Sequence, residues 1–308
     1  MIIRHMGSRL RLLLTVRQRG LLLAVLAAAC WGTSGLFVNV ILGGGGLSAW
    51  ALAFWRAVFT FLTLLLVLGW KRPSALRTAR RDLPWLAGMG ASMGLLHVTW
   101  NASIMTNGVP VATVMQYNAP IIVAVAAWLL WREPFTRRGV AAMALAMGGT
   151  LLMAWPAAPG AAVRGMTLPG LLVGLGTAVA YSSFTLCGKQ VASRYEPWTI
   201  VLYVFGFSTL VLLPFQFAQP APWPQPPLAL AAFAALVWLT TMSGYALYTL
   251  SLRWLPAGEA VIASVSEVVF AAVLAFLLLG QALAPLQLVG AACVSGSVVL
   301  LSARIKKS

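Results

Sequence analysis

The sequence predicts an all-α polytopic membrane protein with ten transmembrane helices in two inverted five-helix repeats. Hydrophobic residues make up 61% of the 308 residues, charged residues only 8%, and the mean hydropathy is +0.90. A soluble domain carries about 25% charged residues, so this chain could not cover a water-exposed surface. Apolar runs long enough to span a bilayer recur along the chain, and their order repeats at its midpoint.

The first half contains five such runs, separated by short turn-rich segments. A helix needs about 20 apolar residues to cross a hydrocarbon core of ~30 Å. The turns include "GGGG" at 43–46 and "TNGVP" at 106–110, where glycine, asparagine and proline favour helix ends. The predicted spans of this half are residues 21–42, 49–70, 83–105, 109–131 and 137–156.

The second half repeats the scheme after the segment "PAAPGAAVRG" at 156–165. Its second and third spans are separated by "AQPAPWPQPP" at 218–227, whose prolines cannot continue a helix. The remaining chain is too short for a soluble domain. The predicted spans of this half are residues 168–190, 198–218, 227–252, 256–279 and 284–304.

The fourth and ninth spans show the repeat most clearly. "PVATVMQYNAPIIVAVAAWLL" (110–130) and "PAGEAVIASVSEVVFAAVLAFLL" (256–278) both open on proline and continue as a helix rich in small residues. The halves correspond at a spacing of about 147 residues. Because each half crosses the membrane an odd number of times, the halves must have opposite orientations. Inverted repeats of this kind are typical of secondary transporters, with the substrate site near the midplane.

These spans divide the chain into five segments. The repeats are the two large ones, and the other three are short and polar. The predicted segments are a basic cytoplasmic tail (1–20), the first repeat (21–156), a periplasmic linker (157–167), the second repeat (168–304) and a cytoplasmic tail (305–308).

Charge is distributed unevenly across the predicted membrane. The net charge is +16 and the isoelectric point about 11.2, which taken alone would suggest nucleic acid. With the N-terminus inside, however, nearly all lysines and arginines fall on the cytoplasmic side. The predicted outer loops hold only Arg164, and Arg56 falls within a span. This asymmetry follows the positive-inside rule, and predicts an inner-membrane protein with both termini cytoplasmic, surrounded by lipid and without a nucleic-acid partner.

The sequence contains no pattern for a cofactor, a metal site or catalysis. The two histidines, His5 and His97, have no companion ligand at metal-binding spacing, and Asp82 is the only aspartate, so a Ser-His-Asp triad cannot form. No P-loop is present, so ATP is not expected to drive the protein. An enzyme is not expected. The three cysteines fall inside spans without paired spacing: Cys30, Cys187 and Cys293.

Four stretches carry a family resemblance: "AAACWGTSGLFV" (27–38), "FWRAVFTFLTLLLVLG" (54–69), "WREPFTRRGVAAMALAMGGTLLM" (131–153) and "SVSEVVFAAVLAFLLLGQAL" (264–283). With them the chain resembles, over nearly its whole length, the ten-helix EamA-type exporters of the drug/metabolite transporter superfamily. In that family the ninth span often reads Glu-Pro-Val and ends on Gly-Glu. This chain has Glu267-Val268-Val269 and Gly280-Gln281, and keeps the equivalent acid of its first half as Glu133.

The resemblance implies export of a small molecule by alternating access, but fold alone does not choose the substrate. Members carry amino acids, nucleotide sugars, organophosphates or drugs, and exporters of neutral and aromatic amino acids of the YddG type are most similar in size and aromatic content. We therefore expect a neutral or aromatic amino acid, with a nucleoside, a sugar derivative or an organic cation as alternatives. A monomer is the starting expectation. A channel or an intramembrane enzyme would differ in showing non-saturating flux or product formation.

Ionisable residues inside spans are candidates for function. Glu267 could face a central cavity and bind a substrate ammonium or a proton, or it could be a structural residue hydrogen-bonded to a neighbouring helix. Arg56 could bind a carboxylate in a bidentate manner, or it could cap a helix end or extend toward the membrane surface.

Polar and aromatic residues of the spans complete the candidate site. His97, Trp100 and Asn101 share one face of span three because they are three and four residues apart, and this stripe either lines a cavity or bonds to another helix. Pro120 should interrupt span four. The remaining candidates for a cavity lined by spans 1, 3, 4, 6, 8 and 9 are Trp31, Gln116, Tyr117, Asn118, Tyr181, Tyr245 and Tyr248.

Overall fold

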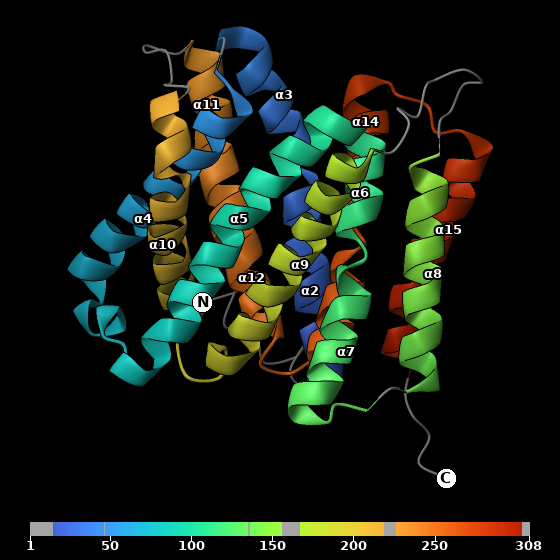
Figure 1. Cartoon of the computed structure of the whole chain (residues 1–308), viewed down its shortest axis with the longest axis horizontal. Helices are drawn as coiled ribbons and strands as arrows, with labels where there is room; N and C mark the ends of the chain where they lie inside the picture. Colours follow the sequence, from blue (N-terminus) through green and yellow to red (C-terminus); the bar gives the residue numbers. More distant parts are fainter. Residues whose placement is uncertain (1–14, 46, 135, 156–166, 219–225, 304–308) are drawn as a thin grey trace, which may run out of the picture.

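The computed structural model describes residues 15–303 apart from 46, 135, 156–166 and 219–225. Every regular element in these residues is a helix, and the helices form one bundle (Figure 1). The predicted fold class, an all-α polytopic protein, is confirmed. Most of the predicted tails and linker lies outside the described residues, together with Arg164.

Helices α2 (Val16–Gly32) and α3 (Ser34–Gly45) form the first span. The helix begins five residues before the predicted boundary because Thr15 and Gln18 cap it reciprocally: the backbone N–H of Gln18 donates to the Thr15 hydroxyl at 3.2 Å, and the backbone N–H of Thr15 donates to Oε1 of Gln18 at 3.0 Å. Helix α4 (Ala49–Lys71) follows its cap, Ser48. Two short 3₁₀ turns, η1 (Pro73–Leu76) and η2 (Arg80–Asp82), lead into α5 (Leu83–Asn107).

The fourth span is two half-helices, α6 (Val109–Gln116) and α7 (Ala119–Trp131). The expected interruption is present, and Pro120 lies in the first turn of α7, where its missing amide hydrogen costs nothing. The Asn118 side-chain amide donates to the carbonyls of Val114 and Met115, at 3.2 and 3.1 Å, and so satisfies groups that the break frees. Helix α8 (Arg137–Met153) completes the half.

The second half begins with α9 (Leu168–Val191) and α10 (Pro197–Ala218). Its third span is α11 (Pro227–Ala235), a π-helical segment η3 (Leu236–Ser243) and α12 (Gly244–Ser251). Its fourth span is again broken, into α13 (Ala257–Ser264) and α14 (Glu267–Leu279), and α15 (Pro285–Ser302) ends the half.

The broken spans show the internal repeat at the level of single residues. Helices α6 and α13 begin at Val109 and Ala257, 148 positions apart, and α7 and α14 begin at Ala119 and Glu267, again 148 apart. Both α7 and α14 contain 13 residues, and each is followed by a cap residue in the left-handed conformation, Arg132 (φ 56°) and Gly280 (φ 65°). The spacing expected from the sequence, about 147, was therefore one residue short at these helices.

Eight helical stretches in the described residues are long and apolar enough, by length and composition, to cross a membrane. The two other predicted spans also form helices. Helix α5 carries the polar stripe of span three, and α8 has 17 residues. The observed helices follow all ten predicted apolar runs, so the predicted count agrees with the structure.

Close helix contacts depend on glycine. Helices α8 and α15 lie side by side at one edge of the bundle (Figure 1). A Cβ atom at Gly290 would lie 2.6 Å from the Gly149 carbonyl oxygen, and one at Gly149 would lie 2.7 Å from that of Gly290. The two backbones therefore touch, as expected where lipid provides no hydrophobic driving force and close packing must hold helices together.

Candidate functional site

A cavity of about 630 Å³ lies in the middle of the bundle. Its walls come from α2 to α6, α9, η3, α12 and α14, so both halves contribute. The lining extends to one end of the bundle, where it includes Leu42, Ala49, Met105 and Val109 at the ends of their helices. We call this end the mouth. At the opposite, arginine-rich end, which we call the basic end, the space is filled by fully buried side chains such as Leu252 and Leu255.

Ten of the twelve residues selected from the sequence line this one cavity. They come from α2, α4, α5, α6, α9, α12, α14 and the break after α6, and their gathering does not by itself test their roles. They are Trp31, Arg56, His97, Trp100, Asn101, Gln116, Tyr117, Tyr181, Tyr245 and Glu267. Asn118 and Tyr248 are not among the lining residues.

The two excluded residues have structural partners. Asn118 bonds back to its own helix, as described above. Tyr248 is fully buried beneath the cavity, and its hydroxyl lies 2.9 Å from the Thr185 hydroxyl. It differs from Tyr245 because residues three apart on a helix point about 60° apart, enough to direct one ring to the cavity and the other into the core.

Glu267 is the first residue of α14 and is partly exposed to the cavity. Its carboxyl group interacts with the hydroxyl of Tyr117, which stands at the break after α6. The acid of one broken helix thus meets the tyrosine of the equivalent broken helix in the other half. A helix N-terminus favours negative charge, which reduces the cost of an ionised carboxylate at this depth.

Arg56 lies on α4 and His97 on α5. Nη2 of Arg56 is 2.9 Å from Nδ1 and 2.6 Å from Nε2 of His97. A guanidinium has five N–H donors and no acceptor, so His97 can bond to it only through an unprotonated ring nitrogen. Nε of Arg56 is buried and has no hydrogen-bond partner. The guanidinium is therefore partly satisfied and not neutralised.

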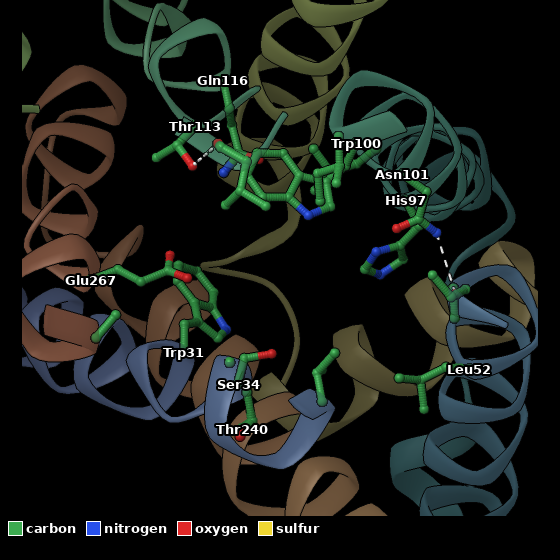
Figure 2. Close-up of a pocket in the computed structure, with 18 of the residues that line it drawn as sticks. Trp31, Ser34, Leu52, His97, Trp100, Asn101, Thr113, Gln116, Thr240 and Glu267 are labelled. Carbon is green, nitrogen blue, oxygen red and sulfur yellow. Dashed lines mark hydrogen bonds between the residues drawn. The ribbon is translucent and has the colours of Figure 1, made fainter. Parts of the chain in front are cut away.

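Glu267 and His97 lie on opposite sides of the cavity (Figure 2). The three ion pairs found among the described residues include neither Glu267 nor Arg56. Glu267 and the guanidinium of Arg56 therefore face the same cavity without forming an ion pair with each other. No group of three or more His, Cys, Asp or Glu side chains in the described ranges could hold a metal ion.

Aromatic rings form the floor of the cavity, between the residues Glu267 and Arg56 and the basic end. The Trp31 ring centroid lies 4.9 Å from that of Tyr245 and 5.2 Å from that of Tyr248. A Cβ atom at Gly244 would lie 2.6 Å from the Trp31 indole nitrogen, so glycine is what admits this ring. The hydroxyl of Tyr181 lies 2.8 Å from that of Ser264 at the break of the ninth span. The floor thus offers large apolar faces with few free polar groups.

Several cavity residues were not selected from the sequence. Thr240 and Thr241 face the cavity from the π-helical segment η3. Trp50 also lines the cavity and stacks on Phe215 at 4.9 Å. The adjacent threonines in an apolar span were a detectable signal. The π-helix that orients them was not, because no proline or glycine within it marks the change.

A helical membrane bundle built from two similar halves around one polar and aromatic cavity defines a membrane transporter. The profile of the EamA-like transporter family matches residues 18–155 and 168–303, one match for each half. The chain belongs to this family.

Relatives agree with the assignment. The chain is 26% identical over 278 residues to an uncharacterized transporter of Archaeoglobus fulgidus, covering 90% of this chain and 93% of the relative. It is 26% identical over 291 residues to the uncharacterized inner membrane transporter YicL of Salmonella typhimurium, covering 92% and 95%. A probable terminal-alkyne amino-acid exporter of Streptantibioticus cattleyicolor is 27% identical over 290 residues, covering 91% and 92%. A solved crystal structure with a TM-score of 0.74 and 18% identity covers 91% of this chain and 95% of its own, and shows the shared fold.

Proposed function

We propose that this protein exports neutral or aromatic amino acids across the inner membrane by alternating access between two inverted halves. The observation that carries the proposal is the placement of Glu267 and Arg56 on different walls of one cavity, with no ion pair to either among the described residues. Separate charges of opposite sign match the ammonium and carboxylate of a zwitterion.

The cavity walls also suit such a substrate. Trp31, Trp100 and Tyr245 offer aromatic faces to an apolar side chain, while Ser34 and Gln116 offer hydrogen bonds. Apolar walls with a few placed polar groups are the usual form of a small-molecule site. The relative described as a probable amino-acid exporter supports the same class of substrate.

The single cation argues against polyanions. Arg56 is the only lysine or arginine that lines the described cavity. A desolvated phosphate dianion needs several donors, so sugar phosphates should be poor substrates.

Counterflow in proteoliposomes tests the proposal. Vesicles loaded with one amino acid should accumulate the labelled amino acid transiently, in a saturable manner, and unlabelled neutral or aromatic amino acids should compete. Nucleosides, sugar phosphates and organic cations are run in parallel. The proposal is wrong if no amino acid shows counterflow while one of these other classes does.

A further inference from the structure

Arg56 lies inside a membrane protein and forms no ion pair with an acidic residue of the described part of the chain. Arginine stays charged at any accessible pH, and an unpaired charge at this depth is costly. The only polar side chain bonded to it through Nη2 in the described residues is His97, which supplies a lone pair but no negative charge. His97 is 9% exposed and its contact therefore lies in a largely dry wall.

We propose that Arg56 is the carboxylate subsite of this cavity and that His97 is a positioning residue that holds the guanidinium toward it. The inference rests on the proposed function and adds the direction in which the amino acid binds. The carboxylate lies at the α4–α5 wall and the ammonium at Glu267 on the opposite wall (Figure 2). The N–H groups of Arg56 that His97 does not occupy are the donors that the carboxylate takes.

Substrate analogues with one charged group removed test this direction. The probes are the best amino acid from the counterflow screen, its decarboxylated amine and its deaminated acid. In the wild type both analogues should compete poorly. Arg56→Gln should raise KM for the amino acid about 10- to 100-fold, the range of a lost hydrogen bond to a charged group. This variant should also bind the amine and the amino acid with equal affinity.

His97 variants separate positioning from a general structural role. His97→Leu removes the acceptor and should raise KM for the amino acid without changing competition by the amine. His97→Gln restores an acceptor and should bring KM back to within a few-fold of the wild type. Arg72→Gln is the matched control, because it removes the same charge at the other end of α4, where Arg72 is paired with Glu196 and largely exposed.

Two outcomes would overturn the subsite. The first is wild-type discrimination against the amine in a folded Arg56→Gln protein. The second is equal loss for all three probes in His97→Leu. If Arg56→Gln fails to fold, Arg56→Lys keeps the charge and should retain discrimination against the amine with a raised KM. Absence of amino-acid counterflow in the wild type would instead contradict the proposed function.

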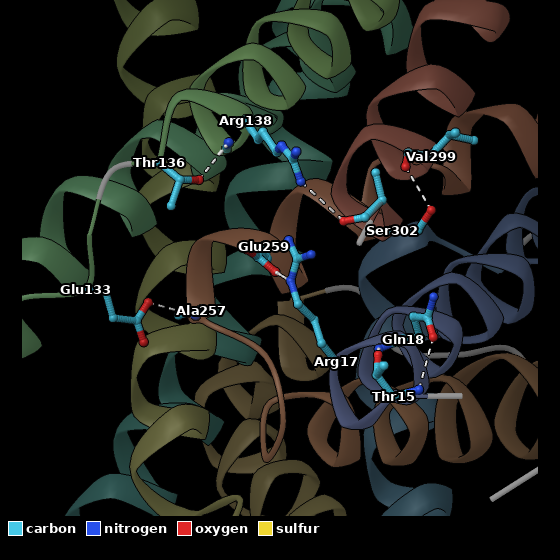
Figure 3. Close-up of polar contacts among 12 residues, drawn as sticks. Thr15, Arg17, Gln18, Glu133, Thr136, Arg138, Ala257, Glu259, Val299 and Ser302 are labelled. Carbon is cyan, nitrogen blue, oxygen red and sulfur yellow. Dashed lines mark hydrogen bonds and ion pairs between the residues drawn. The ribbon is translucent and has the colours of Figure 1, made fainter. Parts of the chain in front are cut away.

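A second, independent observation concerns the basic end. Here the N-terminal turn of α13 is held by the carboxylate of Glu133 and the guanidinium of Arg17 (Figure 3). The backbone N–H of Ala257 donates to Oε2 of Glu133 at 3.1 Å. Arg17, on α2, donates from Nε and Nη2 to the two oxygens of Glu259, both at 2.9 Å. Glu133 and the α13 turn belong to different halves, so these contacts, which we call the latch, tie the halves together.

The equivalent positions at the mouth are neutral. Glu133 stands two residues after α7, and Gln281 stands two residues after α14. Glu259 is the third residue of α13, and Val111 is the third residue of α6. Gln281 is exposed to solvent. An ionised carboxylate bonds a helix N-terminus more strongly than an amide does. The contacts that close the basic end are therefore stronger than those that the equivalent residues could form at the mouth.

We infer that the latch biases the transporter toward the state seen here, closed at the basic end and open at the mouth. The inference requires two inverted halves that alternate, and it is independent of the substrate. A protein without native cysteines and with Thr113→Cys reports the open mouth, because Thr113 lines the cavity. The rate of its labelling by a membrane-impermeant maleimide, applied at the mouth side, measures the population of this state.

Weakening the latch at the basic end or adding its counterpart at the mouth should slow labelling in both cases. Glu133→Gln weakens the basic end, and Gln281→Glu strengthens closure of the mouth while leaving the latch intact. We expect a labelling rate at least threefold slower in each variant, because the population of the open state falls. Glu196→Gln is the control, since it removes one acid from an exposed ion pair at the basic end and should leave the rate unchanged. An unchanged or faster rate in either test variant overturns the inference.

Discussion

Tyr117 and Glu267 stand at the breaks of two equivalent helices, one from each half, and their side chains interact in the wall of the cavity. Discontinuous helices are a frequent way to build a transporter site, because a break exposes backbone ends and polar side chains at the midplane. In this protein the interaction between the two breaks couples the halves at the place where a substrate ammonium is proposed to bind.

Glu267 separates a substrate-binding role from a structural one. If it binds the ammonium, Glu267→Gln keeps the shape and hydrogen bonding but removes the charge. KM for amino acids should rise at least about 10-fold while the melting temperature stays near that of the wild type. If the residue is structural, Glu267→Gln should transport almost normally and Glu267→Ala should lose ~1–2 kcal/mol of stability. Counterflow and thermal unfolding of the two variants distinguish these outcomes. Tyr117→Phe shows how much of each effect comes from the contact between the Tyr117 hydroxyl and Glu267.

Asp82 should make stability depend on pH. Its carboxylate is buried outside the spans and accepts from the Tyr195 hydroxyl at 2.7 Å and from Arg194. The hydrogen bond from Tyr195 lowers the pKa of Asp82, burial opposes this shift, and the charge of Arg194 adds to it. Because the folded pKa lies below the unfolded value of about 3.9, the stabilisation is present above that pH and is lost as pH falls through the folded pKa.

The corresponding variant is Asp82→Asn. At pH 7 its melting temperature in detergent should fall by roughly 2–4 °C, and the difference from the wild type should shrink as pH drops below about 4. A difference that is constant with pH would show that the ionised carboxylate is not what stabilises this turn.

Gly290 should tolerate no side chain. Gly290→Val places its Cβ within 2.6 Å of the Gly149 carbonyl and forces α8 and α15 apart. We expect a loss of about 1–3 kcal/mol, measured as a lower melting temperature. Gly296→Val is the matched control on the same helix, because nothing lies within 4 Å of a Cβ atom there. Equal destabilisation by both would point to helix propensity instead of packing.

Membrane orientation is the simplest test of the inverted halves. In a protein without native cysteines, Gly45→Cys, Ala162→Cys and Trp223→Cys should react with an impermeant reagent from the periplasm. Leu76→Cys and Arg194→Cys should react only from the cytoplasm. This pattern follows from the positive-inside rule and an odd number of crossings in each half. Reversed labelling of either group would contradict it.

The sequence by itself determined the helices of this protein. A span is a local property, since about 20 consecutive apolar residues suffice to specify it, and all ten predicted runs are helical. The interruption near Pro120 was readable for the same local reason. The break before Glu267 was not predicted, because Val265 and Ser266 carry no proline or glycine to mark it.

Only the tertiary structure decided which polar residues share the cavity. A helix that is apolar on all sides has no polar face that fixes its rotation, so sequence spacing could not separate Tyr245, which lines the cavity, from Tyr248, which is buried behind it. The pairing of Arg56 with His97 likewise joins two helices whose relative rotation depends on contacts along their whole length. The apolar runs along the sequence determine how often a chain crosses a membrane. The packing of the helices against one another determines what each side chain faces.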